Sequence, residues 1–99
     1  MLKTGLSNKH KQLVITILQM NQHIESALLF GSRAIGTYKN SSDIDIALIG
    51  EKLTLTDIAN IQVELEQTTL PYHVDLVIKQ TITSPELHKH IETFGIKWI

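Results

Sequence analysis

The stretch Asp43-Ile44-Asp45-Ile46-Ala47-Leu48-Ile49 alternates between acidic and apolar residues at its start and then becomes wholly apolar, before a glycine follows it. This pattern predicts a β-strand that is polar only where it begins. On a strand, Asp43 and Asp45 project from one face and the isoleucines between them from the other. The sequence therefore predicts a mostly buried strand with two carboxylates on one face.

Outward from this stretch, other segments predict a sheet covered by helices. Apolar runs predict strands at 27–30 and 73–78, and residues 96–99 are compatible with an edge strand. Helices are predicted at 7–22, 54–67 and 84–94, with a turn of helix and a loop at 32–42. The cap signals are Ser84 before Pro85, and Thr54 with Asp57. The first helix carries its predicted apolar face on Leu13, Ile17, Met20 and Ile24. The order predicts an α/β (α+β) fold in which helices pack against a small mixed sheet.

The composition is that of a globular chain: 42% of its 99 residues are apolar and 19% are charged. A chain of this size supports one core, so we expect a single domain over residues 1–99. The lack of cysteine excludes thiolate metal sites and cysteine nucleophiles, and it favours a cytoplasmic location. A formal charge of -1 and short apolar runs predict no direct nucleic-acid binding, no membrane segment and no signal peptide.

Three of the four aspartates, Asp43, Asp45 and Asp75, fall in stretches that otherwise predict buried strands. Aspartate is depleted in strands because burying its charge is costly. If the strand of Asp75 lies beside that of Asp45, the three carboxylates converge, and repulsion should raise the pKa of at least one. Hard oxygen ligands suit Mg²⁺, and paired metal ions clamp phosphoryl groups. Any one of the three alone is more simply a turn or strand-end residue.

Gly31-Ser32 follows a predicted buried strand and precedes a turn of helix. Free backbone N–H groups at such a place attract phosphate, although the same pair is also an ordinary strand stop and helix cap. Arg33, the only arginine, would supply a guanidinium fork to phosphate or simply be a solvated loop residue. The spacing to Gly36 is that of a P-loop, but the required Lys is absent. Among the histidines, His73 would share the face of Asp75, two positions away.

Taken in order, Gly31-Ser32, ten residues, Asp43-Ile44-Asp45 and later Val74-Asp75-Leu76 resemble the signature of the DNA polymerase beta type nucleotidyltransferase superfamily. More closely, the stretches Leu29-Phe30-Gly31-Ser32-Arg33-Ala34 and Ser42-Asp43-Ile44-Asp45-Ile46 resemble the minimal nucleotidyltransferase (MNT) group. The sequence departs from many MNT proteins at Ile35, where they have a second basic residue, for which Lys39 is a possible substitute.

The resemblance implies a nucleotidyltransferase fold and assigns roles to residues. Gly31, Ser32, Arg33 and Ser42 would bind the nucleoside triphosphate, and two Mg²⁺ ions would be held by the catalytic residues Asp43, Asp45 and Asp75. The implied activity is transfer of AMP from ATP to a hydroxyl of a protein partner. Proteins of this kind resemble antitoxins of HEPN toxins, so a helical HEPN protein is the implied partner.

Two alternatives of other classes stay open. In the first, the chain is a non-catalytic antitoxin that neutralises its partner by forming a complex with it. In the second, weaker one, the chain is a small-molecule nucleotidyltransferase of the aminoglycoside type. Only a short stretch follows Asp75, which leaves no evident acceptor-binding domain and counts against the second alternative.

Overall fold

The computed structural model of the chain describes residues 4–99. Its elements, in chain order, are α1 (Asn8–Gln19), β1 (Ser26–Phe30), α2 (Ser32–Ile35), β2 (Ile44–Ile49), α3 (Leu55–Glu66), β3 (Val74–Ile78), the 3-10 turn η1 (Lys79–Thr81), α4 (Pro85–Phe94) and β4 (Ile96–Lys97). These follow the order expected from the sequence, and most bounds differ from the predicted ones by one to three residues. The α/β (α+β) fold class is confirmed.

The strands form one mixed sheet in the order β3-β2-β1-β4. The strands β2 and β3 run parallel, because α3 carries the chain back to the edge where β2 began. The strand β1 runs antiparallel to both of its neighbours. In the sheet, β2 is therefore a central strand and β3 an edge strand, so a side chain on β2 has a neighbour on each side.

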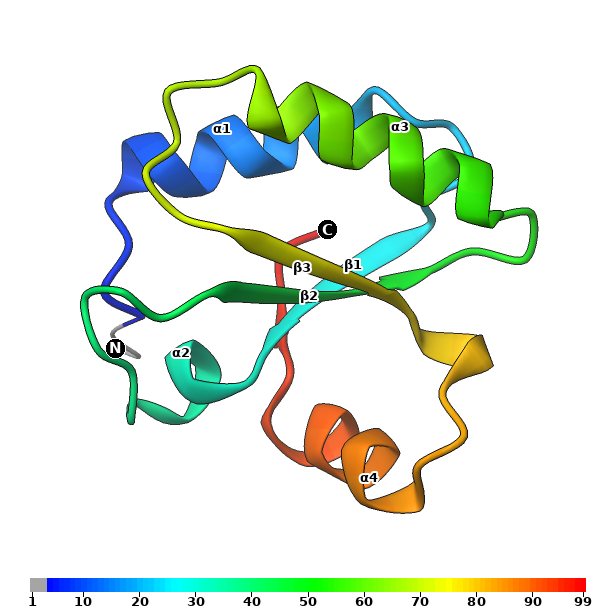
Figure 1. Cartoon of the computed structure of the whole chain (residues 1–99). Coiled ribbons are helices and arrows are strands. Elements are labelled where there is room, and N and C mark those ends of the chain that lie inside the picture. The colour runs from blue at the N-terminus through cyan, green and yellow to red at the C-terminus, as the bar shows by residue number, and fades with distance from the viewer. Residues whose placement is uncertain (1–3) are drawn as a thin grey trace.

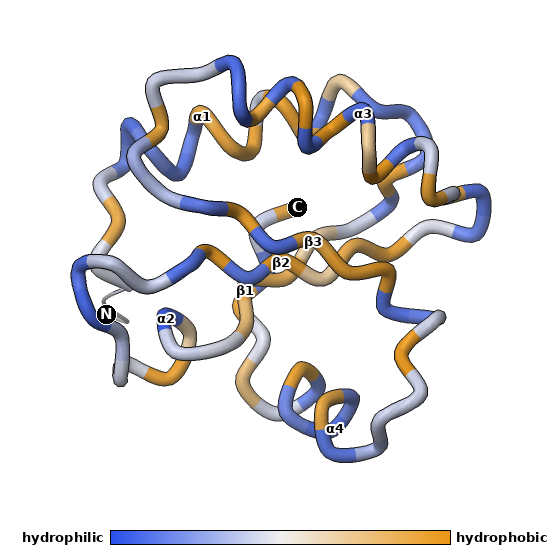
Figure 2. The backbone as a smooth tube through the Cα atoms, in the orientation of Figure 1, coloured by the Kyte–Doolittle hydropathy of each residue, from blue (hydrophilic) through white to orange (hydrophobic). Residues whose placement is uncertain are grey.

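The helices cover the two faces of the sheet unequally (Figure 1). On one face, α1 and α3 pack over the larger core, which includes Val14, Leu18, Leu29, Ile46, Ile61 and Leu76. On the other face, α4 packs over a smaller core built on Phe30, Ala47 and Ile91, while the short α2 contributes Ala34 to the larger core. Along the backbone, apolar residues concentrate in the strands between these two layers (Figure 2). The α4 face is thus the one on which polar groups of the strands remain accessible.

Local signals in the sequence account for where the helices begin. The Ser7 side chain accepts a hydrogen bond at the start of α1, and Ser84 does the same for α4. Thr54 and Asp57 form a reciprocal capping box at the start of α3, as predicted. The predicted apolar face of α1 is wrong at Met20, which is 68% exposed: the helix ends one residue earlier, and Met20 is its C-cap. Within residues 4–99, no helix combines the length and apolar character needed to cross a bilayer.

Candidate active site

The parallel pairing of β2 with β3 brings two predicted carboxylates side by side. Asp45 is in register with Asp75 across the two strands. Both alternate with residues of the smaller core, Ala47 on β2 and Val77 on β3, so both project from the sheet face that α4 covers. Asp75 is exposed because β3 is the edge strand, whereas Asp45 on the central strand is half-buried.

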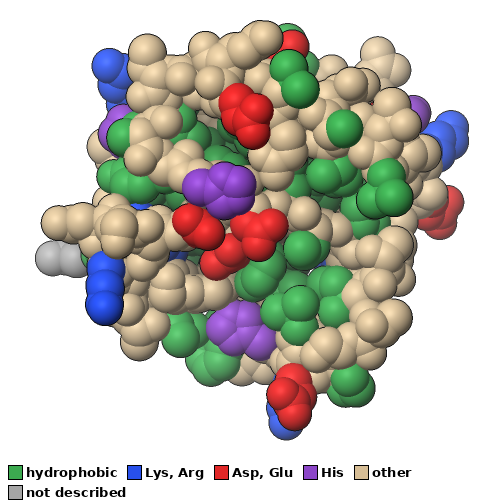
Figure 3. All heavy atoms as spheres, viewed as in Figure 1, with side chains coloured by type: hydrophobic (Ala, Val, Ile, Leu, Met, Phe, Trp, Pro, Cys, Tyr) green, Lys and Arg blue, Asp and Glu red, His purple; other side chains and the backbone are tan. Residues whose placement is uncertain are grey.

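Asp43 lies just before β2, and its charge also acts on Asp45. Burial raises the pKa of the Asp45 carboxyl above its ordinary value of 3.8, and the nearby charges of Asp75 and Asp43 raise it further. The expectation of a raised pKa in this group is confirmed for Asp45. Figure 3 shows acidic side chains grouped between two histidine side chains on this face.

The Gly31-Ser32 turn lies directly against Asp45. Gly31 separates β1 from α2 and has a φ angle of +76°, in the left-handed region that favours glycine. A Cβ atom at this position would collide with the Asp45 carboxylate, which occupies the space that a side chain at position 31 would need. Ser32 opens α2, where the first N–H groups of a helix have no partner within it. The turn predicted to bind phosphate and the central carboxylate are therefore neighbours.

Arg33 has a different environment from the one expected for a phosphate ligand. Its side chain is only 1% exposed, and its guanidinium donates to the main-chain oxygens of Thr4, Asn40 and Ser42. It also lies over the rings of Tyr38 and Tyr72, at 5.2 and 4.7 Å from their centroids. The guanidinium nitrogens of Arg33 thus find their hydrogen-bond acceptors within the protein, because Arg33 points inward from the short α2 helix. Arg33 holds the loop that leads to Asp43 and does not face the Gly31-Ser32 turn.

Ser42, the other predicted nucleotide contact outside the turn, closes the same loop. Its hydroxyl accepts a hydrogen bond from the Lys39 main-chain N–H over 2.8 Å, and its carbonyl oxygen is the acceptor shared by Arg33 Nε and Nη2. Ser42 immediately precedes Asp43, so these bonds order the backbone from which the first carboxylate projects.

Two histidines border the carboxylates, and the sequence analysis missed one of them. When protonated, His73 and His90 each lower the pKa of Asp45, against the larger effects of burial and the neighbouring aspartates. His90 lies in α4, and its Nε2 accepts a hydrogen bond from the Gly31 N–H over 2.9 Å. A signal was available, since His90 follows Leu87 by three positions and so lies on the apolar face of α4.

The chemistry of these donors fits a divalent cation. Within residues 4–99, the ion pairs that form do not involve Asp43, Asp45 or Asp75. Hard oxygen donors with uncompensated negative charge are what Mg²⁺ prefers. In that same part of the chain, no three acidic or histidine side chains already form a group that could hold a metal ion. Rotation of the side chains would therefore have to accompany metal binding, and the metal assignment stays a prediction.

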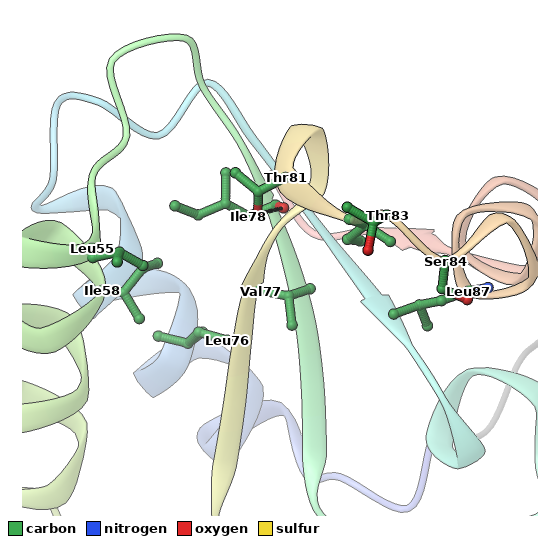
Figure 4. Close-up of a pocket in the computed structure, with 10 residues that line it drawn as sticks. Leu55, Ile58, Leu76, Val77, Ile78, Thr81, Thr83, Ser84 and Leu87 are labelled. Carbon is green, nitrogen blue, oxygen red and sulfur yellow. Dashed lines mark hydrogen bonds between the residues drawn. The ribbon is translucent and has the colours of Figure 1, made fainter.

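An apolar groove of about 390 Å³ lies along the edge strand, and Asp43, Asp45 and Asp75 are not among its lining residues (Figure 4). Residues of α3, β3 and the start of α4 line it, among them Leu55, Ile58, Val77 and Leu87. None of its lining residues is charged, so it lacks groups that would bind a triphosphate.

Comparisons with known proteins agree with this fold. The model of the family described as Polymerase beta, Nucleotidyltransferase matches residues 12–97. A chain of a toxin–antitoxin crystallised with AMP-PNP is 28% identical, with a TM-score of 0.75 over 90% of this chain and 72% of that one. A chain of the toxin–antitoxin MntA–HpeT, in a mutant form, is 30% identical, with a TM-score of 0.71 over 93% of this chain and 72% of that one.

A protein described as a minimal nucleotidyltransferase is 25% identical, with a TM-score of 0.70 over 95% of this chain and 94% of that one. No curated protein is similar enough to count as a match. The resemblance expected from the Gly-Ser and Asp-x-Asp motifs is confirmed. Because the family model covers most of its length, the chain belongs to the polymerase beta nucleotidyltransferase family.

Proposed function

We propose that this chain is a Mg²⁺-dependent nucleotidyltransferase that moves a nucleoside monophosphate, AMP from ATP, onto a hydroxyl of a protein partner. The observation that carries the proposal is the register of β2 and β3, which sets Asp45 beside Asp75, with the Gly31-Ser32 turn in contact with Asp45. Phosphoryl-transfer sites combine a phosphate-binding turn with metal-binding carboxylates, and this chain has a Gly-Ser turn beside carboxylates that could take these two roles.

Each part of the site has a role in this proposal. The N–H groups that begin α2 and the Ser32 hydroxyl would bind the β and γ phosphates. Asp43, Asp45 and Asp75 would hold two divalent ions, which neutralise triphosphate charge when bound. Arg33 would act from a distance, by ordering the loop before Asp43.

The transfer itself is a substitution at the α phosphorus. The acceptor hydroxyl oxygen forms a bond to this phosphorus while the bond to the pyrophosphate oxygen breaks, and pyrophosphate leaves. The hydroxyl proton passes to a carboxylate, for which exposed Asp75 at the open edge of the sheet is the best placed. Half-buried Asp45, which lies against Gly31, would hold a divalent ion between itself and the triphosphate.

We infer that the acceptor is a HEPN-type toxin for which this chain acts as antitoxin. The support is the similarity to toxin–antitoxin chains at 28% and 30% identity, one of them crystallised with the ATP analogue AMP-PNP. The location in this proposal is the cytoplasm, where ATP and Mg²⁺ are available.

The deciding experiment incubates the chain with the purified product of the neighbouring gene, Mg²⁺ and each nucleoside triphosphate in turn, followed by intact-mass measurement of the partner. We expect a mass increase by whole nucleoside monophosphates, largest with ATP, and none with Asp75→Asn. The matched control is Glu66→Gln, an exposed carboxylate at the end of α3 on the opposite face of the sheet.

Mass unchanged with every nucleotide, together with neutralisation of the toxin that needs no ATP and survives Asp75→Asn, would instead establish a non-catalytic antitoxin. Transfer to an aminoglycoside without any partner would establish the small-molecule enzyme.

A further inference from the structure

A hydrogen bond from outside the predicted motifs holds the Gly31-Ser32 turn. The main-chain N–H of Gly31 donates to His90 Nε2 over 2.9 Å, across 59 positions of sequence. The half-buried His90 ring lies edge-on to Phe30 and tilted against Phe94, with centroids 6.1 and 5.4 Å apart. We call the hydrogen bond between Gly31 and His90 the Gly31 latch.

In the Gly31 latch, the imidazole of His90 is the hydrogen-bond acceptor. Because Nε2 accepts the Gly31 proton, this nitrogen carries no proton of its own. A phenylalanine at position 90 would keep a ring of similar size beside Phe30 and Phe94 but would have no acceptor. A glutamine would lose the ring but can carry its Oε1 close to the position of Nε2. The two substitutions therefore separate packing from hydrogen bonding.

Beyond the turn, α2 is anchored by the buried Arg33 and Ala34, but Gly31 itself has no side chain with which to pack. The strand β1 ends at Phe30, and α2 has only four residues, too few to be stable by its own hydrogen bonds. Gly31 itself has the wide conformational freedom of glycine and adopts a positive φ angle. The latch ties Gly31 to α4, a ten-residue helix anchored by buried Ile91.

The Gly31-Ser32 turn lies against the Asp45 carboxylate. The space that a Gly31 side chain would fill is already occupied by the Asp45 carboxylate, so the position of the Gly31 main chain limits where this carboxylate can lie.

We propose that His90 is a positioning residue of the nucleotide site: through the Gly31 latch it fixes the turn that binds phosphate relative to the Asp45 carboxylate. This inference rests on the proposed function, since it adds a residue of α4 to the same site. His90 is assigned no part in the chemical step.

The test compares His90→Phe, His90→Gln and the wild-type chain. Calorimetry with a non-hydrolysable ATP analogue and Mg²⁺ measures binding, and amide hydrogen exchange of Gly31 in the nucleotide-free protein reports the latch. For His90→Phe we expect about tenfold weaker binding and about tenfold faster Gly31 exchange, the size of one lost hydrogen bond. His90→Gln should restore both to within about threefold of wild type.

The matched control is His88→Phe, on the same helix, with a side chain 47% exposed and away from the turn, which should change neither quantity. Equal binding and exchange in wild type and His90→Phe would overturn the latch, as would failure of His90→Gln to differ from His90→Phe. A wild-type chain that does not bind the analogue at all would overturn the proposed function, whatever the Gly31 exchange shows.

Discussion

Replacing Arg33 by lysine should destabilise the protein far more than it weakens nucleotide binding. The guanidinium makes four hydrogen bonds to three main-chain oxygens, at 2.9 to 3.4 Å, and is 1% exposed. Lysine keeps the charge but has no planar fork, so it can satisfy one or two of the three carbonyls at a time.

The expected loss follows from these contacts. A hydrogen bond from a charged donor contributes about 1.5 to 3 kcal/mol, and a buried acceptor left without a partner adds to the cost. With the two tyrosine faces retained, we expect Arg33→Lys to lower the free energy of unfolding by about 3 kcal/mol. For a domain of this size that loss lowers the Tm by about 12 to 24 °C.

Urea unfolding, followed by the fluorescence of the single tryptophan, Trp98, measures this change directly, since Trp98 is buried in the larger core. Lys39→Met is the matched control, because Lys39 is an exposed cation in the same loop, and its substitution should stay within about 0.5 kcal/mol. If Arg33→Lys unfolds like wild type but binds an ATP analogue about tenfold more weakly, the guanidinium acts on phosphate and our reasoning from burial is refuted.

Three further substitutions probe the site and its surroundings. Asp45→Asn should abolish transfer yet stabilise the metal-free protein at neutral pH. Because the pKa of Asp45 is raised in the folded state, the folded protein loses stability as pH rises above 3.8, and asparagine removes that loss. The midpoint of urea unfolding in EDTA should therefore be higher for the variant than for wild type. Gly31→Ala should lower the free energy of unfolding by about 2 kcal/mol or more and disrupt nucleotide binding, because the φ angle is +76° and the new Cβ would collide with the Asp45 carboxylate. The control is Gly36→Ala, where φ is +88° but the space is open, so only the backbone strain should lower its stability. Equal urea midpoints for the two variants would contradict this reasoning. His23→Ala should make the stability of the protein less sensitive to acid. The hydrogen bond from His23 is the main cause that holds the pKa of Asp57 well below 3.8, and the stabilisation that it gives is lost as pH falls below 3.8. Parallel curves of urea midpoint against pH for wild type and variant would argue against this.

The strands, the starts of the helices and the strand face on which a carboxylate lies could be predicted, because each is set by residues close by in the sequence. The alternation in 43–49 fixed which side of a strand Asp45 occupies, and the Thr54–Asp57 pair located the start of α3. Register could not be predicted in this way. Asp75 meets Asp45 only because β3 pairs with β2 in parallel at that alignment, and a slip of one residue would have turned one carboxylate to the other face.

Arg33 and His90 show what the sequence could not determine. The motif around Arg33 suggested a phosphate ligand, but the guanidinium is buried against the loop and two tyrosines. His90 carried no motif at all, yet it bonds to the central glycine of the site. Propensity, periodicity and capping act over a few residues, and the sequence records them directly. Which side chain fills the space between two packed elements depends on how helices and sheet come together, and only the tertiary structure decided that.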